Sequence, residues 1–141
     1  MILVDEAAIA TFLRSIRTVA VLGIKTEAQR EQPGYYVPEA LQRAGLKIVP
    51  VPVYYPNVTE ILGEKVYRTL AAIPEAVDLV DVFRRPEDID EHIEDILAKK
   101  PRGVWFQSGI RNDVAAERLS QAGITVVQDR CLMVDHQRYV K

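Results

Sequence analysis

The fold is decided by the stretch Arg17-Thr18-Val19-Ala20-Val21-Leu22-Gly23-Ile24-Lys25. The apolar, β-branched run from Thr18 to Leu22 predicts a short strand covered on both faces, which is typical of a parallel sheet. Gly23 ends this strand, and a polar loop then leads into a helix expected over residues 35–44. A strand, a glycine turn and a helix N-terminus form the arrangement with which α/β proteins hold phosphate.

Apolar runs and helical patterns alternate along the rest of the chain. Further strands are expected at 46–52, 76–83, 103–107 and 124–127, and further helices at 6–16, 86–100, 113–122 and in the tail around 132–134. A very short additional strand is expected within 61–67. This alternation predicts an α/β fold, a doubly wound parallel sheet of about five to six strands in three layers, and one domain over 1–141.

The expected strand order places a ligand site at one edge of the sheet. The first strand is predicted to be central, with the second and the short third on one side and the strands ending at Phe83, Gln107 and Val127 on the other. Ligands of such sheets bind outside the carboxyl ends of the strands, at the point where the order reverses. The loop 23–34 and the loop 83–86 therefore face each other.

These two loops carry basic side chains, namely Lys25, Arg30, Arg84 and Arg85. They predict a site for an anionic group such as a pyrophosphate. Two other interpretations stay open. The charges are solvated, as most lysines and arginines are, or the two arginines pair with the acidic segment 87–95 that follows them.

Composition excludes several classes of function. Net charge is −2, so no basic field argues for nucleic acid. No apolar run is long enough to cross a membrane, and acidic residues follow Met1-Ile2-Leu3-Val4 too soon for a secretory signal. A single cysteine, Cys131, cannot form a disulfide within the chain, so a cytoplasmic location is expected.

The pattern also argues against NAD as the ligand. The dinucleotide fingerprint requires three spaced glycines in the turn and an acidic residue at the end of the second strand. This turn has Gly23 alone, and the second strand ends in Val51-Pro52-Val53-Tyr54 without an acid. An apolar strand end of this kind still suits a flat adenine ring.

The chain resembles the small stand-alone CoA-binding proteins, which are similar to the N-terminal CoA-binding domain of the succinyl-CoA synthetase alpha subunit. The most specific segments are Val-Asp-Leu-Val-Asp-Val-Phe-Arg at 77–84 and Asp-Arg-Cys at 129–131. The resemblance extends over nearly the whole chain and is carried by 19–23, 45–51, 62–64, 74–85, 105–110 and 129–133. It implies a Rossmann-like fold that binds coenzyme A.

The resemblance also implies a set of site residues. The CoA phosphates would lie at Gly23, Ile24, Lys25 and Arg30, with backbone donors from Tyr36 and Val37. The adenosine half would lie against Pro52 and Val53, the opposite wall would be Val82, Phe83 and Arg84, and the pantetheine end would face Gln107 and Ser108. Many members of the family have a glycine where this chain has Tyr36, so the Tyr36 side chain is expected to crowd the pyrophosphate.

No catalytic residue or metal ligand set is expected. His92 lies in an acidic segment and His136 in the tail, and the synthetase's phosphorylated histidine belongs to a further domain. Cys131 is interpreted as an inert buried residue, with exchange against the CoA thiol as the alternative. Three hypotheses remain: a CoA or acyl-CoA binding module, a subunit of a CoA ligase completed by a separate protein partner, and a protein for another nucleotide that has lost CoA binding.

Overall fold

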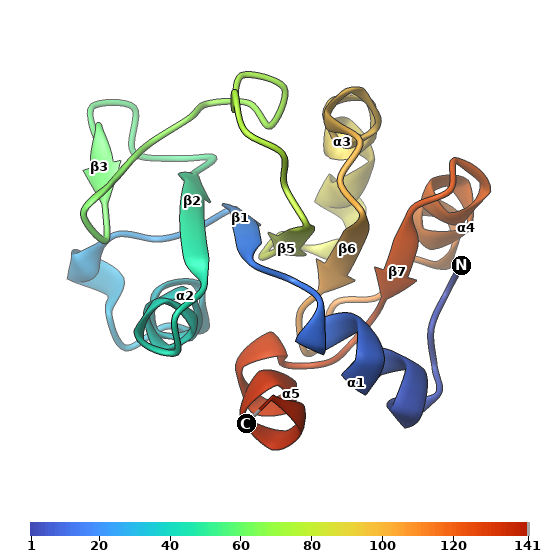
Figure 1. Ribbon diagram of the computed structural model, residues 1–141. Helices are drawn as coiled ribbons and strands as arrows, with labels where there is room; N and C mark the ends of the chain where they lie inside the picture. Colours follow the sequence, from blue (N-terminus) through green and yellow to red (C-terminus); the bar gives the residue numbers. More distant parts are fainter. Residues whose placement is uncertain (141) are drawn as a thin grey trace.

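The computed structural model describes residues 1–140 and contains a five-stranded parallel sheet with strand order β2-β1-β5-β6-β7 (Figure 1). The strands are β1 (Thr18–Leu22), β2 (Lys47–Val51), β5 (Leu79–Val82), β6 (Gly103–Phe106) and β7 (Thr125–Val127). The helices are α1 (Glu6–Arg14), α2 (Pro33–Arg43), α3 (Ile93–Lys99), α4 (Asp113–Gln121) and α5 (Leu132–Tyr139), with 3-10 helices η1 (Glu27–Gln29) and η2 (Pro86–His92). The predicted α/β Rossmann-like fold is confirmed.

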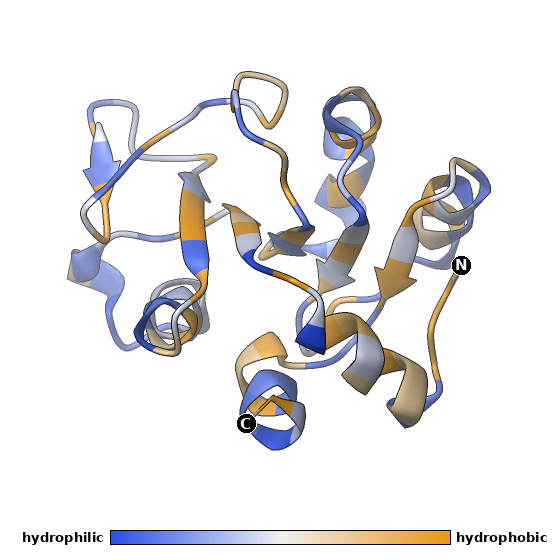
Figure 2. Cartoon of the chain, in the orientation of Figure 1, coloured by the Kyte–Doolittle hydropathy of each residue, from blue (hydrophilic) through white to orange (hydrophobic). Residues whose placement is uncertain are grey.

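Strand β1 occupies the centre of the sheet because it pairs in parallel with β2 on one side and β5 on the other. Its side chains alternate between two cores. Val19 and Val21 contribute to one core, and Ala20 and Leu22 to the other. Figure 2 shows β1 and β2 coloured mostly as hydrophobic, in contrast to the polar loops beside them.

Helices cover both faces, as the three-layer prediction requires. The apolar stripes of α1, α2 and α5 pack on one face, through Ile9, Leu41 and Leu132 among others. The other face is covered by η2, α3 and α4. Figure 1 shows α5, the end of the chain, lying between α1 and α2. Within residues 1–140, none of the helices is both long and apolar enough to span a membrane.

The prediction of a short third strand in the main sheet is wrong. Residues 60–65 instead form a separate antiparallel hairpin of β3 (Glu60–Ile61) and β4 (Glu64–Lys65). Leu62 and Gly63 both have positive φ, 55° and 74°, and this left-handed turn reverses the chain locally. The five-stranded sheet therefore ends at β2, and the segment 52–78 returns to β5 without adding a strand to this sheet.

Candidate functional site

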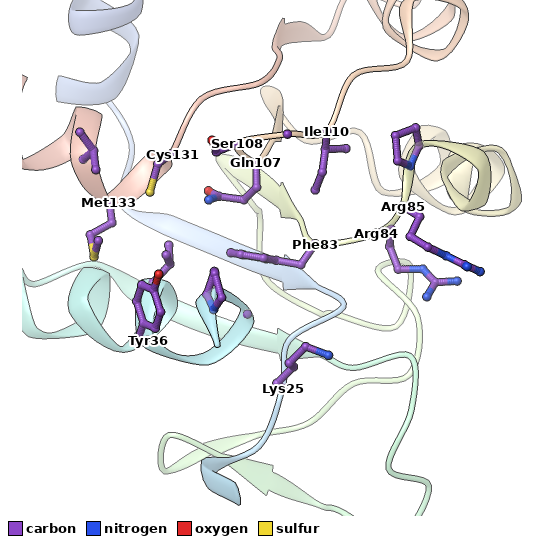
Figure 3. A pocket seen from close by; sticks show the side chains of 16 residues that line it. Lys25, Tyr36, Phe83, Arg84, Arg85, Gln107, Ser108, Ile110, Cys131 and Met133 are labelled. Atoms are coloured by element: carbon purple, nitrogen blue, oxygen red, sulfur yellow. The ribbon is translucent and has the colours of Figure 1, made fainter. Parts of the chain in front are cut away.

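A cavity of about 720 Å³ lies at the carboxyl edge of the sheet, beside the ends of β1, β5 and β6. This is the place where the strand order reverses between β1 and β5. The cavity is lined by Lys25, Pro33, Gly34, Tyr36, Val37, Phe83, Arg84, Arg85, Pro86, Gln107, Ser108, Gly109, Ile110, Cys131, Met133 and Val134. Figure 3 shows Phe83, Gln107, Cys131 and Tyr36, from different elements, gathered around one space, with Arg84 and Arg85 at its edge and directed away from it.

Gly23 brings the turns after β1 and β5 into direct contact. Its φ is +87°, a conformation that side chains rarely adopt. A Cβ built at this position would lie 2.4 Å from the carbonyl oxygen of Phe83 and 3.3 Å from Cδ of Arg84. Glycine is therefore required at position 23, because any side chain there would push apart the turns that follow β1 and β5.

Lys25 is tied to Gly34 at the start of α2. The Lys25 backbone N–H donates to the Gly34 carbonyl over 3.1 Å. That carbonyl has no partner inside the helix because Pro38, four residues on, has no N–H. The Lys25 stem also covers Gly34, since a Cβ there would lie 3.1 Å from Lys25 Cγ. Within residues 1–140, the Lys25 ammonium makes no ion pair, so it offers a free positive charge to the cavity.

Tyr36 differs from its expected role as a backbone donor. Its N–H already donates to the Gln32 carbonyl over 3.1 Å, in the first turn of α2. Its side chain is 39% exposed and lines the cavity. Figure 3 places its ring near Met133, whereas Lys25 and the two arginines lie on the other side of Phe83. The expected crowding by Tyr36 thus falls at the end of the cavity away from the basic side chains.

Arg84 is held in a network and is only 9% exposed. Its Nε donates to His92 Nε2 over 3.1 Å, and its guanidinium also pairs with Glu91 and approaches the Tyr54 hydroxyl. Burial alone lowers the pKa of Arg84, but hydrogen bonds with Tyr54 and Glu91 outweigh it and raise the pKa. Burial, followed by the charge of Arg84, lowers the pKa of His92, which therefore stays neutral and accepts this bond at pH 7.

Arg85 points outward and donates to Asp88 over 2.7 Å. Arg84 and Arg85 thus both pair with carboxylates of the acidic segment 87–95. This confirms the alternative prediction that the two arginines pair with the segment that follows them. Carboxylates of η2 partly neutralise the charges of these two arginines. Among the cavity-lining residues that the structure describes, Lys25 is therefore the cation without an ion pair.

The start of α5 is fixed to β6 by two side chains. Trp105 Nε1 donates to the Arg130 carbonyl over 2.7 Å, and Gln107 Oε1 accepts the Leu132 N–H over 3.0 Å. These bonds place Cys131 and Met133 at the cavity. Gln107 is 3% exposed, and its Nε2 makes no hydrogen bond within residues 1–140 although the residue lines the cavity. The site therefore contains an unused amide donor.

The cavity brings together about half of the predicted site residues, namely Lys25, Tyr36, Val37, Phe83, Arg84, Gln107 and Ser108. It does not include Gly23, Ile24, Arg30, Pro52, Val53 or Val82. Ile24 and Val82 are buried in the two cores because their side chains point into the packed faces of the sheet. Arg30 is exposed at the end of η1, and Pro52 is buried after β2.

Three lining residues were not expected at the site: Ile110, Met133 and Val134. Pro33, Gly34, Arg85 and Pro86 belong to the two loops that were expected to face each other, and Gly109 and Cys131 were expected at this edge of the sheet without a firm role. The dipeptide Pro33-Gly34 carried a usable signal, because proline at the first helical position followed by glycine marks a helix start that a ligand can approach. No local sequence signal marks Met133 and Val134 as site residues, since their position depends on where α5 packs.

Comparisons with known proteins identify the family of the chain. Residues 17–137 match a family described as a CoA binding domain. The uncharacterized protein YneT of Bacillus subtilis is 34% identical over 132 residues, which cover 94% of each chain.

Solved structures share the fold. The protein called cell-free ID.343 from Thermus thermophilus is 38% identical, with a TM-score of 0.87 over 96% of this chain and 99% of that one. The chain also superposes on part of the dinucleotide-forming acetyl-coenzyme A synthetase 1 from Ca. Korarchaeum cryptofilum, with a TM-score of 0.67 and 19% identity. That match covers 81% of this chain but only 26% of the synthetase, and at this identity it shows the common fold alone.

Proposed function

The chain belongs to the CoA-binding domain family, and from this premise we propose that the cavity at the carboxyl edge of its sheet binds coenzyme A or an acyl-CoA without catalysis by the chain itself. The observation that carries the proposal is the unpaired Lys25 ammonium in a cavity at the β1–β5 crossover. A cation beside the N-terminus of α2 suits a pyrophosphate, which the helix dipole also favours.

The ligand is proposed to run across the ends of three strands. Its phosphates lie at Lys25 and at the outward edge of Arg84, close to the turn after Gly23. The adenosine half extends towards Pro52 and Val53 at the end of β2, and the pantetheine arm passes Phe83 to reach Gln107 and Ser108. The volume of about 720 Å³ falls within the range of small-molecule sites, roughly 300–1,000 Å³.

The side chains near the cavity support binding without chemistry. His92 is engaged as an acceptor for Arg84, and His136 is not among the residues that line the cavity. No nucleophile and base are bonded to each other in the lining of the cavity, within residues 1–140. A module of this kind would present or sequester its ligand.

Replacing Lys25 with methionine tests the proposal. Methionine keeps the stem that covers Gly34 but removes the charge, so we expect CoA affinity to fall roughly 10- to 100-fold, the usual loss of a charged hydrogen bond. Calorimetry on the wild type should show CoA binding more tightly than NAD or ATP. Lys65→Met, on the β3–β4 hairpin outside the cavity, is the matched control and should bind CoA as the wild type does. Failure of CoA to bind at millimolar concentration, with NAD or ATP binding instead, would overturn the proposal.

A further inference from the structure

The cavity is divided by charge. Its cationic lining residues, Lys25, Arg84 and Arg85, lie on one side of Phe83 in Figure 3. On the other side are Tyr36, Cys131 and Met133, with Val134 next to them on α5. We call Tyr36, Gln107, Cys131, Met133 and Val134 the α5 end of the cavity.

Among the residues that the structure describes, no positively charged side chain lines the α5 end of the cavity. Arg130 is the nearest in sequence, but its guanidinium is bonded to Asp135 and paired with Glu6. The hydrogen bond with Asp135, together with the nearby carboxylates, raises the pKa of Arg130 despite partial burial, as expected for a tightly paired guanidinium. Arg130 does not line the cavity. A carboxylate at this end would lose water without gaining a positively charged side chain as a partner, which is unfavourable.

Gln107 supplies a donor at the α5 end. Its Oε1 is fixed by the Leu132 N–H, so its Nε2 is the atom left without a partner within residues 1–140. The residue is 3% exposed, but within residues 1–140 the buried side-chain atoms without a partner are those of Asp81 alone, so water in the cavity reaches Nε2. An acceptor from a ligand, such as a carbonyl oxygen, would replace that water. Figure 3 shows the end of this side chain directed toward Cys131 and Met133.

The rim of the α5 end is apolar and uncovered. Val134 is 52% exposed and Tyr36 is 39% exposed, and both line the cavity beside Met133. Covering such side chains with a hydrocarbon group is favourable in proportion to the area removed from water. The thiol of free CoA offers no hydrocarbon to this rim, and the nearest carbonyl of free CoA is the pantetheine amide, which a nitrogen and two carbons separate from the sulfur.

We propose that the α5 end is a thioester subsite for short, uncharged acyl groups. Gln107 Nε2 donates to the thioester carbonyl, and the acyl chain lies against Tyr36, Met133 and Val134. The ligand class is therefore an uncharged short-chain acyl-CoA rather than free CoA or a carboxylated acyl-CoA. This inference rests on the proposed function, because it places the CoA phosphates at the basic end.

Calorimetric titration of the wild-type protein with CoA, butyryl-CoA and succinyl-CoA tests the subsite. We expect butyryl-CoA to bind about tenfold more tightly than CoA, since three carbons leave water. Succinyl-CoA, of the same length but charged, should bind no more tightly than CoA. Equal affinity for all three ligands, or tightest binding of succinyl-CoA, would overturn the subsite and leave CoA binding intact. Binding of none of them would overturn both proposals.

A charge placed at the rim gives a second readout. In Val134→Lys the ratio of succinyl-CoA to butyryl-CoA affinity should rise about fivefold, because an ammonium then faces the acyl carboxylate. The ratio cancels any effect on the part of the ligand that both share. Val114→Lys is the matched control, an exposed valine on α4 outside the cavity, and it should leave the ratio unchanged. An unchanged ratio in Val134→Lys would place the acyl group elsewhere.

Discussion

Asp81→Asn is expected to stabilise the protein at neutral pH and to remove most of a decline in stability that the wild type shows as pH rises. Asp81 lies in the middle of β5, between Val21 and Trp105 on the neighbouring strands, and is 0% exposed. Neither carboxylate oxygen has a hydrogen-bond partner within residues 1–140. Burial therefore raises the pKa of Asp81 well above its ordinary value.

The direction of the pH effect follows from that shift. Because the pKa of Asp81 is higher in the folded state than in the unfolded state, the folded protein binds more protons above about pH 4. The contribution of Asp81 to stability is greatest below its unfolded pKa, and stability falls by about 1.4 kcal/mol per pH unit until the folded pKa is reached. Asparagine, which has nearly the same shape and no charge, carries no such loss.

Urea unfolding at several pH values between 4 and 8 measures this difference. Asp78→Asn, three residues earlier, is a control of opposite sign. Burial by itself would raise the pKa of Asp78. Hydrogen bonds from the N–H groups of Thr18 and Arg17 and from the Arg102 side chain outweigh burial and lower the pKa below its ordinary value. The carboxylate of Asp78 thus stabilises the fold above its unfolded pKa, and its loss should destabilise at neutral pH. A wild type and Asp81→Asn with parallel pH profiles would contradict the account of Asp81.

Gly23→Ala is expected to destabilise the fold and to weaken CoA binding together. The left-handed φ of +87° costs a side chain about 1–2 kcal/mol. The added Cβ, 2.4 Å from the Phe83 carbonyl oxygen, forces the two turns apart at a further cost of about 1–3 kcal/mol. Phe83 and Arg84 line the cavity, so this displacement widens the site and should lower CoA affinity about tenfold or more.

Gly123→Ala separates the two causes. Gly123 has nearly the same φ, +85°, but no atom lies within 4 Å of its built Cβ, and it is outside the cavity. This variant should lose only the conformational part of the stability and should bind CoA like the wild type. Urea unfolding and calorimetry of both variants measure the two effects. Equal losses of stability in the two variants, with unchanged CoA affinity in Gly23→Ala, would show that the contact with Phe83 is unimportant.

The sequence predicts the main sheet well because its strands are continuous apolar runs and its helices have clear start and stop residues. Asp5 and Asn112 cap α1 and α4 through their side chains, as local pattern suggests. The error at 60–65 arose because a two-residue strand carries almost no periodicity, and only its positive-φ turn decides that it folds back on itself.

The sequence predicts those residues of the candidate site that lie in loops directly after the strands. Lys25, Phe83 and Arg84 follow directly from the strand order. Met133 and Val134 did not, because they reach the cavity through the packing of α5 between α1 and α2, a contact between distant segments. The use of the Tyr36 N–H by the helix, and the bond from Lys25 to Gly34, are details of turn geometry that residue type alone does not specify.

The location of the bound ligand is the central claim, and amide chemical-shift mapping by NMR during titration with CoA tests it most directly. The account predicts that the largest shifts fall on amides around the cavity, such as those of Gly34, Phe83 and Gly109, while Val114 and Gly123 stay in place. Saturating shifts confined to α4 or to the amino edge of the sheet, with the cavity amides unmoved, would contradict it.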